Sequence, residues 1–478
     1  MRTTRKTPQK ILSILIVLLA LNIRMTNALL DSKGVDVLTP SACTVIQVLC
    51  FILIAYINFF PTFTIHKVST TRNKILEDGV SLLQIFLITT IIETIYSLAI
   101  LIVYGTAFFV VGVPSVPDSD SGFSFLAGEY IILLVWHLVI AFLVELILFW
   151  NGIIRVYLTS VQLGMKWRVI GIICGWIPIA QIYALCKIIR ITGNEVIYEN
   201  EKYLLNQTRA ENEECKTRYP ILLVHGVFFR DFRFFNYWGR IPAELKKNGA
   251  TVFYGNQQSA ASVERCGEEL TKRIKQIVQE TGCEKVNIIA HSKGGLDSRY
   301  AISACGAADY VATLTTVNTP HNGCIFADHL LNKIPDKICC NVASKYNAAL
   351  SKFGDSDPNF MEAVQDLTAS SCARLNAMLP DSAQVYYQSV GTKMAHASGG
   401  RFPLNMAYPM VKHFDGDNDG LVSVDSMKWG SNFICLTVPK GRGISHGDMI
   451  DLNRENIPGF DVREFYVGLV RDLKDMGY

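Results

Sequence analysis

The segment KVNIIAHSKGGLDSRYAIS, residues 285–303, predicts a strand, a sharp turn and a helix in direct succession. Ser292 stands at the turn, with the small residues Ala290 and Gly294 two positions before and after it. Small residues are needed there because the turn brings the strand and helix backbones together and lifts the serine hydroxyl clear of the sheet edge. Ala290 replaces the more usual glycine with little extra volume. The pattern predicts Ser292 as a nucleophile.

Short apolar runs lie on both sides of this turn and alternate with amphipathic segments. Runs at 221–226, 251–255, 285–292 and 311–320 predict strands. Between the second and third, an apolar stripe at helical spacing predicts a helix, with Val263, Leu270, Ile274 and Ile277. Strands that alternate with helices favour an α/β fold class, with a mainly parallel sheet covered by helices on both faces.

A nucleophilic serine needs a histidine base and an acid that orients it, and in this fold they follow the serine in the order acid, histidine. His446 is the last histidine and lies in a polar loop before a C-terminal helical segment. The segment HFDGDNDG offers Asp415, Asp417 and Asp419 as the acid. Asp419 is favoured because it directly precedes Gly420-Leu421-Val422, where a strand-end turn gives way to apolar residues. We therefore predict Asp419 and His446 as the partners of the serine.

Negative charge builds on the substrate oxygen during acyl transfer, so two backbone N–H groups should point at that oxygen. We predict the N–H groups of Lys293, next to the nucleophile, and of Val227, in the loop after the first strand. The same loop contains Phe228 and Phe229, which we expect to contact an apolar acyl chain. Residues 327–380 have a mixed helical pattern and are the expected place for a cap or lid.

These motifs together resemble the bacterial triacylglycerol lipases of the true-lipase group, in the α/β-hydrolase superfamily. The resemblance rests on LLVHG (222–226), YWGRIPAELKKNGATVFYG (237–255), VERCGEELTKRI (263–274), the nucleophile segment, TPHNGCIFAD (319–328), NDGLVS (418–423) and HGD (446–448). It implies hydrolysis of carboxylic esters, with acylglycerols as the leading substrate class. The catalytic acid and histidine of the family fall on Asp419 and His446.

The resemblance also raises the question of a structural calcium ion. In those lipases an aspartate two residues after the catalytic histidine helps to hold the ion, and Asp448 matches it. The partner aspartate, about twenty residues before the acid, is missing from the segment HASGGRFPLNMAYP. We therefore expect no cofactor, and Asp448 is a weak candidate for a calcium ligand.

The charges divide the chain in two. Residues 1–190 carry 14 Lys and Arg and 9 Asp and Glu, whereas the remainder carries 31 and 33. The first part is typical of a multi-pass membrane region, and the second is a soluble domain, slightly acidic and without the basic stripe of a nucleic-acid binder. We expect a membrane region at 1–190, a linker at 191–218 and a lipase-like domain at 219–478.

About five apolar runs in the first part are candidates for membrane segments. The first is short enough to be a signal peptide, so its cleavage stays open. Lys and Arg gather in the loops expected on the inside, and five crossings would place the hydrolase outside the cytoplasm. The nine cysteines of that domain favour a reducing compartment instead. The runs lie at 11–23, 43–65, 80–113, 130–150 and 169–186.

The leading hypothesis is a membrane-anchored serine ester hydrolase whose partners are a lipid ester substrate and the bilayer. A phospholipase or a glycolipid deacylase is the alternative within hydrolases. An alternative of another class is a transport or scaffold protein with an inactive hydrolase module. For that reading the ionisable residues inside the spans, Glu93, His137 and Glu145, are either functional groups or polar contacts between helices. The sequence indicates no protein partner.

Overall fold

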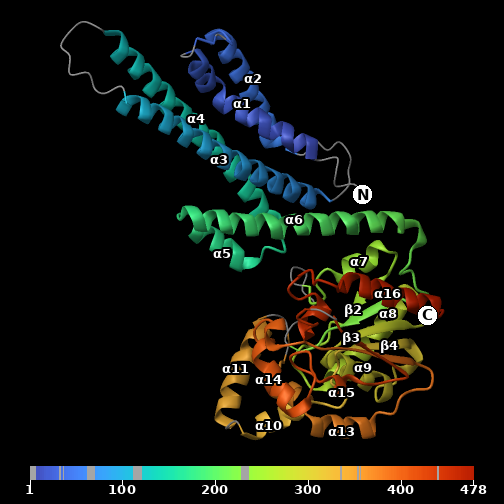
Figure 1. Cartoon of the computed structure of the whole chain (residues 1–478). Helices are drawn as coiled ribbons and strands as arrows, with labels where there is room; N and C mark the ends of the chain where they lie inside the picture. Colours follow the sequence, from blue (N-terminus) through green and yellow to red (C-terminus); the bar gives the residue numbers. More distant parts are fainter. Residues whose placement is uncertain are drawn as a thin grey trace. The chain divides into compact units, whose positions relative to one another are not determined.

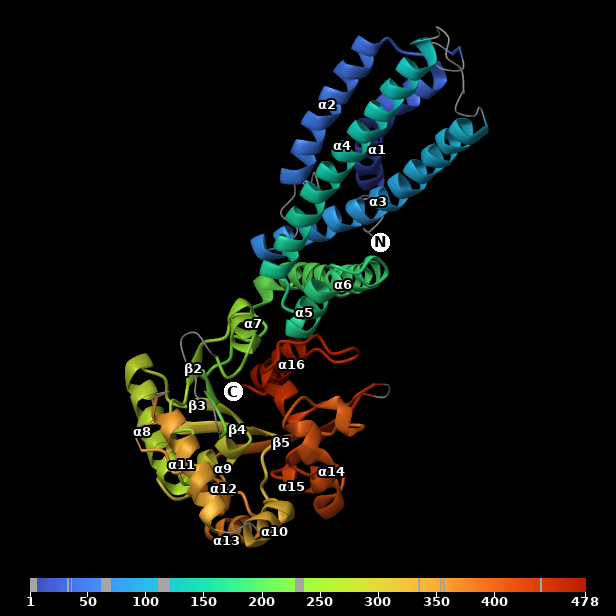
Figure 2. The ribbon, with the colours of Figure 1, turned by 90° about the vertical axis from the view of Figure 1, so that its left-hand side faces the viewer.

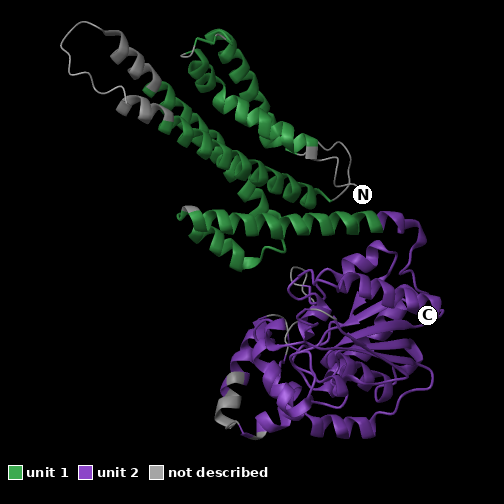
Figure 3. Cartoon of the chain, in the orientation of Figure 1, with its two compact units in different colours: residues 1–205 green, residues 206–478 purple. Residues whose placement is uncertain are grey.

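The chain forms two compact units, residues 1–205 and 206–478 (Figure 3). The computed structural model describes the chain except for residues 1–6, 32–33, 36, 62–69, 111–120, 228–235, 334–335, 353–354, 356 and 439–440. We describe each unit by itself.

The first unit is entirely helical in its described part. Four of its helices are long and apolar enough to cross a membrane, at Pro8–Asp31, Pro40–Phe59, Thr71–Ile102 and Ile131–Thr159. These lie within α1 to α4, and two further helices follow them. The bounds are α1 Thr7–Asp31, α2 Pro40–Phe59, α3 Thr71–Val110, α4 Ser121–Thr159, α5 Gly164–Cys174 and α6 Pro178–Thr208.

Helices α1 to α4 pack against one another as a bundle (Figures 1 and 2). Val17 and Leu21 of α1 are buried in the same apolar cluster as Leu82 of α3 and Leu148 of α4. The first apolar segment therefore packs within the bundle. Near Gly152 the helices α3 and α4 come so close that an added Cβ would lie 2.9 Å from Leu83.

The fifth apolar run, 169–186, does not form one helix. Helix α5 ends at Cys174, a turn follows, and α6 begins at Pro178. A proline has no backbone N–H and is favoured in the first turn of a helix, so Pro178 starts a helix more readily than it continues one. The first part of the expected linker at 191–218 is helical, because α6 continues to Thr208.

The second unit is built on a six-stranded sheet of order β2-β1-β3-β4-β5-β6, in which all neighbouring strands are parallel. The four predicted strands are present, and the predicted fold class is confirmed. The bounds are β1 Ile221–Val224, β2 Val252–Tyr254, β3 Val286–His291, β4 Val311–Val317, β5 Tyr386–Thr392 and β6 Asn432–Leu436.

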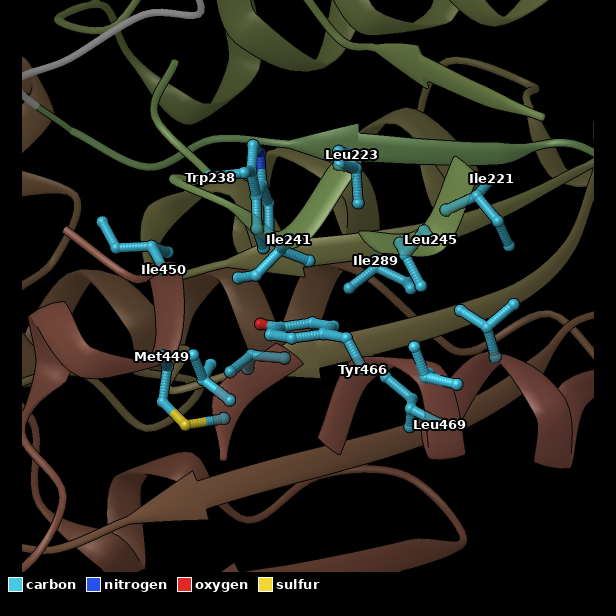
Figure 4. Close-up of a cluster of buried hydrophobic side chains, with 14 of the residues drawn as sticks. Ile221, Leu223, Trp238, Ile241, Leu245, Ile289, Met449, Ile450, Tyr466 and Leu469 are labelled. Carbon is cyan, nitrogen blue, oxygen red and sulfur yellow. The ribbon is translucent and has the colours of Figure 1, made fainter. Parts of the chain in front are cut away.

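Helices cover both faces of this sheet (Figure 1). Leu222 and Ile288 face α8 (Val263–Thr281) and α9 (Lys293–Ser303). Their neighbours Leu223 and Ile289 point to the opposite face, toward α7 (Ile241–Lys247) and α16 (Val462–Asp475), as Figure 4 shows. Side chains alternate between the two faces of a strand, so a strand buried on both faces is apolar at most of its positions. This explains the continuous apolar runs.

The segment between β4 and β5 is helical, and its described residues form no strand. It coincides with the expected cap interval, 327–380. The bounds are α10 Ile325–Lys333, α11 Asp336–Lys352, α12 Phe360–Gln365 and α13 Ala369–Met378. After β5 come α14 Leu404–Asp415 and α15 Val424–Met427, and short 3-10 turns lie at Ala210–Asn212, Ala308–Tyr310, Ala397–Gly399 and His446–Ile450.

Candidate active site

Ser292 occupies the turn between β3 and α9 in a strained conformation, with φ at 56° and ψ at −131°. A residue with a side chain adopts a positive φ only when its surroundings hold it there. Two hydrogen bonds supply this restraint. The N–H of Ser292 donates to the carbonyl of Val317 at 2.9 Å, and the Thr319 hydroxyl donates to the carbonyl of Ser292 at 2.8 Å. Ser292 is half-buried.

The loop after β1 lies directly against this turn, and glycines make the approach possible. A Cβ on Gly294 would clash with the carbonyl oxygen of His225, and a Cβ on Gly226 would lie 2.8 Å from the Cβ of Ser292. The next residue, Val227, is buried. The structure therefore brings together the nucleophile turn and the loop that carries Val227, while Lys293 begins α9 beside Ser292.

Asp419 and His446 form a buried pair in which His446 Nδ1 lies 2.6 Å from Asp419 Oδ2. The other carboxylate oxygen accepts the backbone N–H groups of Leu421 and Val422, at 2.9 and 2.8 Å. The backbone N–H of His446 also donates to the carbonyl of Asp419, at 2.9 Å. The acid is therefore fixed on both oxygens, and it holds the imidazole in one orientation.

The two other aspartates of HFDGDNDG point elsewhere. Asp415 accepts the backbone N–H groups of Ile325 and Phe326, at 2.9 and 3.0 Å, and so stabilises the start of α10. Asp417 is exposed and pairs with Lys393 at 2.8 Å. The backbone of this loop therefore turns only Asp419 toward a histidine.

His291 connects the histidine loop to the nucleophile turn, a role that the sequence reading missed. The Tyr237 hydroxyl lies 2.7 Å from His291 Nδ1, and His291 Nε2 lies 3.2 Å from the carbonyl oxygen of His446. Complete burial lowers the pKa of His291 well below its ordinary value, so the ring is neutral. Its Nε2–H then donates to the carbonyl of His446, and its Nδ1 accepts from Tyr237. The position of His291 directly before Ser292 is the feature of the sequence that could have indicated this role.

The side chain of Lys293 is turned into the protein and is not available to a substrate. Its ammonium forms a fully buried ion pair with Asp297 at 2.6 Å. Burial alone lowers the pKa of Lys293, but the carboxylate of Asp297 outweighs it and the net effect is a raised pKa. Lys293 can therefore offer its backbone N–H alone. Phe228 and Phe229 lie outside the described residues.

The carboxylate of Asp448, the weak candidate for a calcium ligand, is surrounded by protein donors in the described structure. Its two oxygens accept hydrogen bonds from both Nη atoms of Arg442, at 2.7 and 2.9 Å. They also accept hydrogen bonds from the N–H and the hydroxyl of Ser445. Arg442 Nη1 also donates to the carbonyl of Gly399, twenty residues before Asp419, at 2.6 Å. A guanidinium thus supplies the positive charge. The described residues include no group of three or more His, Cys, Asp or Glu that could hold a metal.

Comparisons with known proteins show what this chain is similar to. A family model described as palmitoyl protein thioesterase matches residues 220–385, which include Ser292 but end before Asp419 and His446. The triacylglycerol lipase of Burkholderia plantarii is 36% identical over 186 residues, which cover 36% of this chain and 51% of that protein.

The triacylglycerol lipase of Pseudarthrobacter phenanthrenivorans is 36% identical over 179 residues, 35% of this chain and 55% of that protein. The chain thus spans about half the length of these relatives. Among solved structures, the mature Bacillus licheniformis lipase BlEst2 aligns with a TM-score of 0.39 and 21% identity, over 53% of this chain and 91% of that chain. The relatives and the strand order together support the α/β-hydrolase fold and the likeness to lipases and esterases.

Proposed function

We propose that the chain is a serine hydrolase of lipid carboxylic esters. The proposal is carried by one observation: the buried Asp419–His446 pair, 2.6 Å apart, is tied through His291 to the turn that presents Ser292. The pairing supports the proposal because a carboxylate bound to Nδ1 fixes the tautomer in which Nε2 can act as a base toward a serine.

In the proposed reaction Ser292 Oγ attacks the ester carbonyl carbon while its proton passes to His446 Nε2. The carbonyl oxygen becomes an oxyanion, which the backbone N–H groups of Val227 and Lys293 stabilise. As the carbon–oxygen bond to the alcohol breaks, His446 returns the proton to the leaving oxygen. Water then attacks the acyl-enzyme by the same route and releases the carboxylic acid.

Acylglycerols are the proposed substrates. The two relatives named above are triacylglycerol lipases, and Phe228 and Phe229 follow directly on the proposed oxyanion residue Val227. The helices of 327–380 would cover the site as a cap, and an apolar acyl chain needs such a covered channel.

A thioester hydrolase is the second candidate, because the matching family model is that of palmitoyl protein thioesterases. The same acyl-enzyme chemistry cleaves a thioester, so the site does not distinguish the two. A phospholipase or a glycolipid deacylase remains the alternative among the lipid esterases. Product analysis with mixed lipid vesicles and a palmitoylated peptide separates these substrate classes.

We further propose that α1 to α4 cross a membrane and that the hydrolase unit lies on the cytoplasmic side. The basic residues at the start of the chain favour an inside start. The described residues include four helices long and apolar enough to cross, and four crossings would return the chain to the side on which it began. Lys187 and Arg190 and the free cysteines of the second unit fit this side better than the outside expected from five crossings.

The decisive test is Ser292→Ala in the full chain. Turnover of a short-chain nitrophenyl ester should fall by about six orders of magnitude, as in other serine hydrolases that lose the nucleophile. Ser303→Ala, at the other end of α9, is the matched control and should keep wild-type turnover. A fluorophosphonate probe applied to intact and permeabilised cells reports reactivity and sidedness together. If the Ser292→Ala variant keeps its activity, or the folded protein does not react while the helical unit transports a solute, the hydrolase assignment fails.

A further inference from the structure

A groove of about 620 Å³ lies in the helical unit, and nothing in the hydrolase chemistry uses it. Its walls come from α3 and α4, with Gln181 of α6 at one place. Most of the lining is apolar, and several of these side chains are also exposed at the outer surface of the helices, among them Leu98, Leu101, Phe142 and Leu146. In a bilayer this open side would face hydrocarbon.

Two carboxylates interrupt this apolar lining, Glu93 of α3 and Glu145 of α4. Their exposed fractions are only 5% and 8%. Each has one oxygen that accepts a hydrogen bond: Glu93 Oε1 from the Asn22 amide, and Glu145 Oε2 from the Thr90 hydroxyl at 2.9 Å. The second oxygens, Glu93 Oε2 and Glu145 Oε1, are buried without a hydrogen-bond partner among the described residues.

The neighbouring histidine, His137, does not donate a hydrogen bond to Glu93 Oε2. His137 Nδ1 lies 3.1 Å from the carbonyl oxygen of Leu21, so it carries the proton in the neutral ring. Its other nitrogen, Nε2, is 3.7 Å from Glu93 Oε2 and lies 3.4 Å from the hydroxyl of Ser97. In that tautomer Nε2 is an acceptor and has no proton to give to Glu93. The lining residues include no lysine or arginine.

A buried carboxylate oxygen without a donor carries a desolvation penalty that a ligand with N–H groups relieves. We propose that the groove binds a long-chain primary amine, with its ammonium on Glu93 and Glu145 and its alkyl chain along Leu98, Leu101 and Phe142. An ammonium has three N–H donors and a positive charge, so one head group can serve both carboxylates.

Other occupants match the groove less well. A bare metal ion would leave the apolar walls unused, and the described residues offer it no group of three acidic, histidine or cysteine side chains. A fatty alcohol fits the walls, but its single hydroxyl donates one hydrogen bond and brings no charge to two acids. The amine is therefore the occupant that both the shape and the charge favour.

The test uses the full chain in phosphatidylcholine nanodiscs and measures equilibrium binding of radiolabelled octadecylamine. Wild-type protein should bind it saturably, with octadecanol a much weaker competitor. The double variant Glu93→Gln/Glu145→Gln keeps the side-chain size and should bind about 10- to 100-fold more weakly, since hydrogen bonds to charged groups are lost. Glu201→Gln, an exposed carboxylate on α6, should bind like wild type.

A second variant guards against a folding defect of the first. Leu98→Trp leaves both carboxylates in place, fills the groove from its exposed side, and should also weaken binding. The proposal is overturned if octadecylamine does not saturate, if octadecanol competes equally, or if either groove variant binds like wild type. The assay has no hydrolytic readout, so its result is independent of Ser292.

Discussion

Each unit of this chain buries an acid beside a histidine, and the two pairs differ in how completely their atoms are bonded. In the hydrolase unit Asp419 and His446 are 2.6 Å apart, and the remaining oxygen of Asp419 accepts two backbone N–H groups. In the helical unit His137 and Glu93 are 3.7 Å apart, and the nearer oxygen of Glu93 has no hydrogen bond in the described structure.

This difference separates two uses of the same residue types. A carboxylate whose two oxygens both accept hydrogen bonds is held in one orientation, which suits the proposed role of Asp419 in orienting His446. A buried carboxylate with an open acceptor is costly in the absence of a ligand, and it suits binding better than proton transfer. We therefore assign the closed pair to the proposed ester hydrolysis and the open pair to the proposed binding of an amine.

Among substitutions in the two pairs, the largest effect is expected when Asp419 is replaced and the Asp419–His446 pair is opened. In Asp419→Asn the amide can still accept the backbone N–H groups of Leu421 and Val422, but it presents an N–H to His446 in place of an acceptor. The histidine would then carry its proton on the wrong nitrogen, and kcat should fall by about 10⁴-fold. Steady-state kinetics on a nitrophenyl ester measure this.

The neighbouring aspartate supplies the matched control. Asp417 is two residues away, exposed, and paired with Lys393. Asp417→Asn should leave kcat within about twofold, because a surface ion pair contributes little to the folded state. Equal losses in Asp417→Asn and Asp419→Asn would show that Asp419 is not the acid.

A smaller effect should follow from loosening the loop that carries the closed pair. Arg442 joins Asp448, two residues after His446, to the carbonyl of Gly399. Arg442→Gln removes the charged donors and should lower the free energy of unfolding by about 2 kcal/mol. Denaturant unfolding of the full chain in detergent, followed by tryptophan fluorescence, measures the loss.

Two further measurements test the interpretation of Arg442 as the cation of this loop. A chelator should leave the thermal midpoint of the wild-type protein unchanged, and a drop on chelation would show that a metal contributes after all. Arg471→Gln breaks an exposed pair with Asp472, at 3.8 Å, and should cost less than about 0.5 kcal/mol.

The sequence predicted what depends on local pattern and chain order. The sharp turn at Ser292 and the four strands follow from short-range spacing. The choice of Asp419 as the acid stays a prediction, although the structure pairs Asp419 with His446. Strand β5, Tyr386–Thr392, was not among the predicted strands. It contains Gln388, Ser389 and Thr392, whose polar groups form hydrogen bonds in the folded protein. These polar residues interrupt the apolar pattern by which a buried strand is predicted from a sequence.

Contacts between distant segments were not predictable in the same way. The bond of Arg442 to Gly399 and the tether from His291 to His446 depend on how loops meet at the sheet edge. The meeting of Glu93 with His137 depends on the rotation of α3 and α4 about their axes, which apolar runs do not define. The run at 169–186 was predicted as one span because it is apolar, and the prediction did not allow for Pro178, at which a new helix begins.

The smallest effect concerns the neutral histidine that ties the closed pair to the nucleophile turn. Burial holds the pKa of His291 well below its ordinary value, so between the two values the unfolded chain binds the proton and the folded protein does not. Stability therefore falls as the pH drops below about 6.5, by at most about 1.4 kcal/mol per pH unit for this residue. Buried His321, whose pKa is lowered by burial and by Arg299, adds in the same direction. His291→Gln should make the slope of unfolding free energy between pH 6.5 and 5 shallower. Tyr237 and His446 are the groups that face His291. If the slope is unchanged in His291→Gln, the ring is already protonated in the folded protein over this pH range, and its Nδ1 could not accept a hydrogen bond from Tyr237.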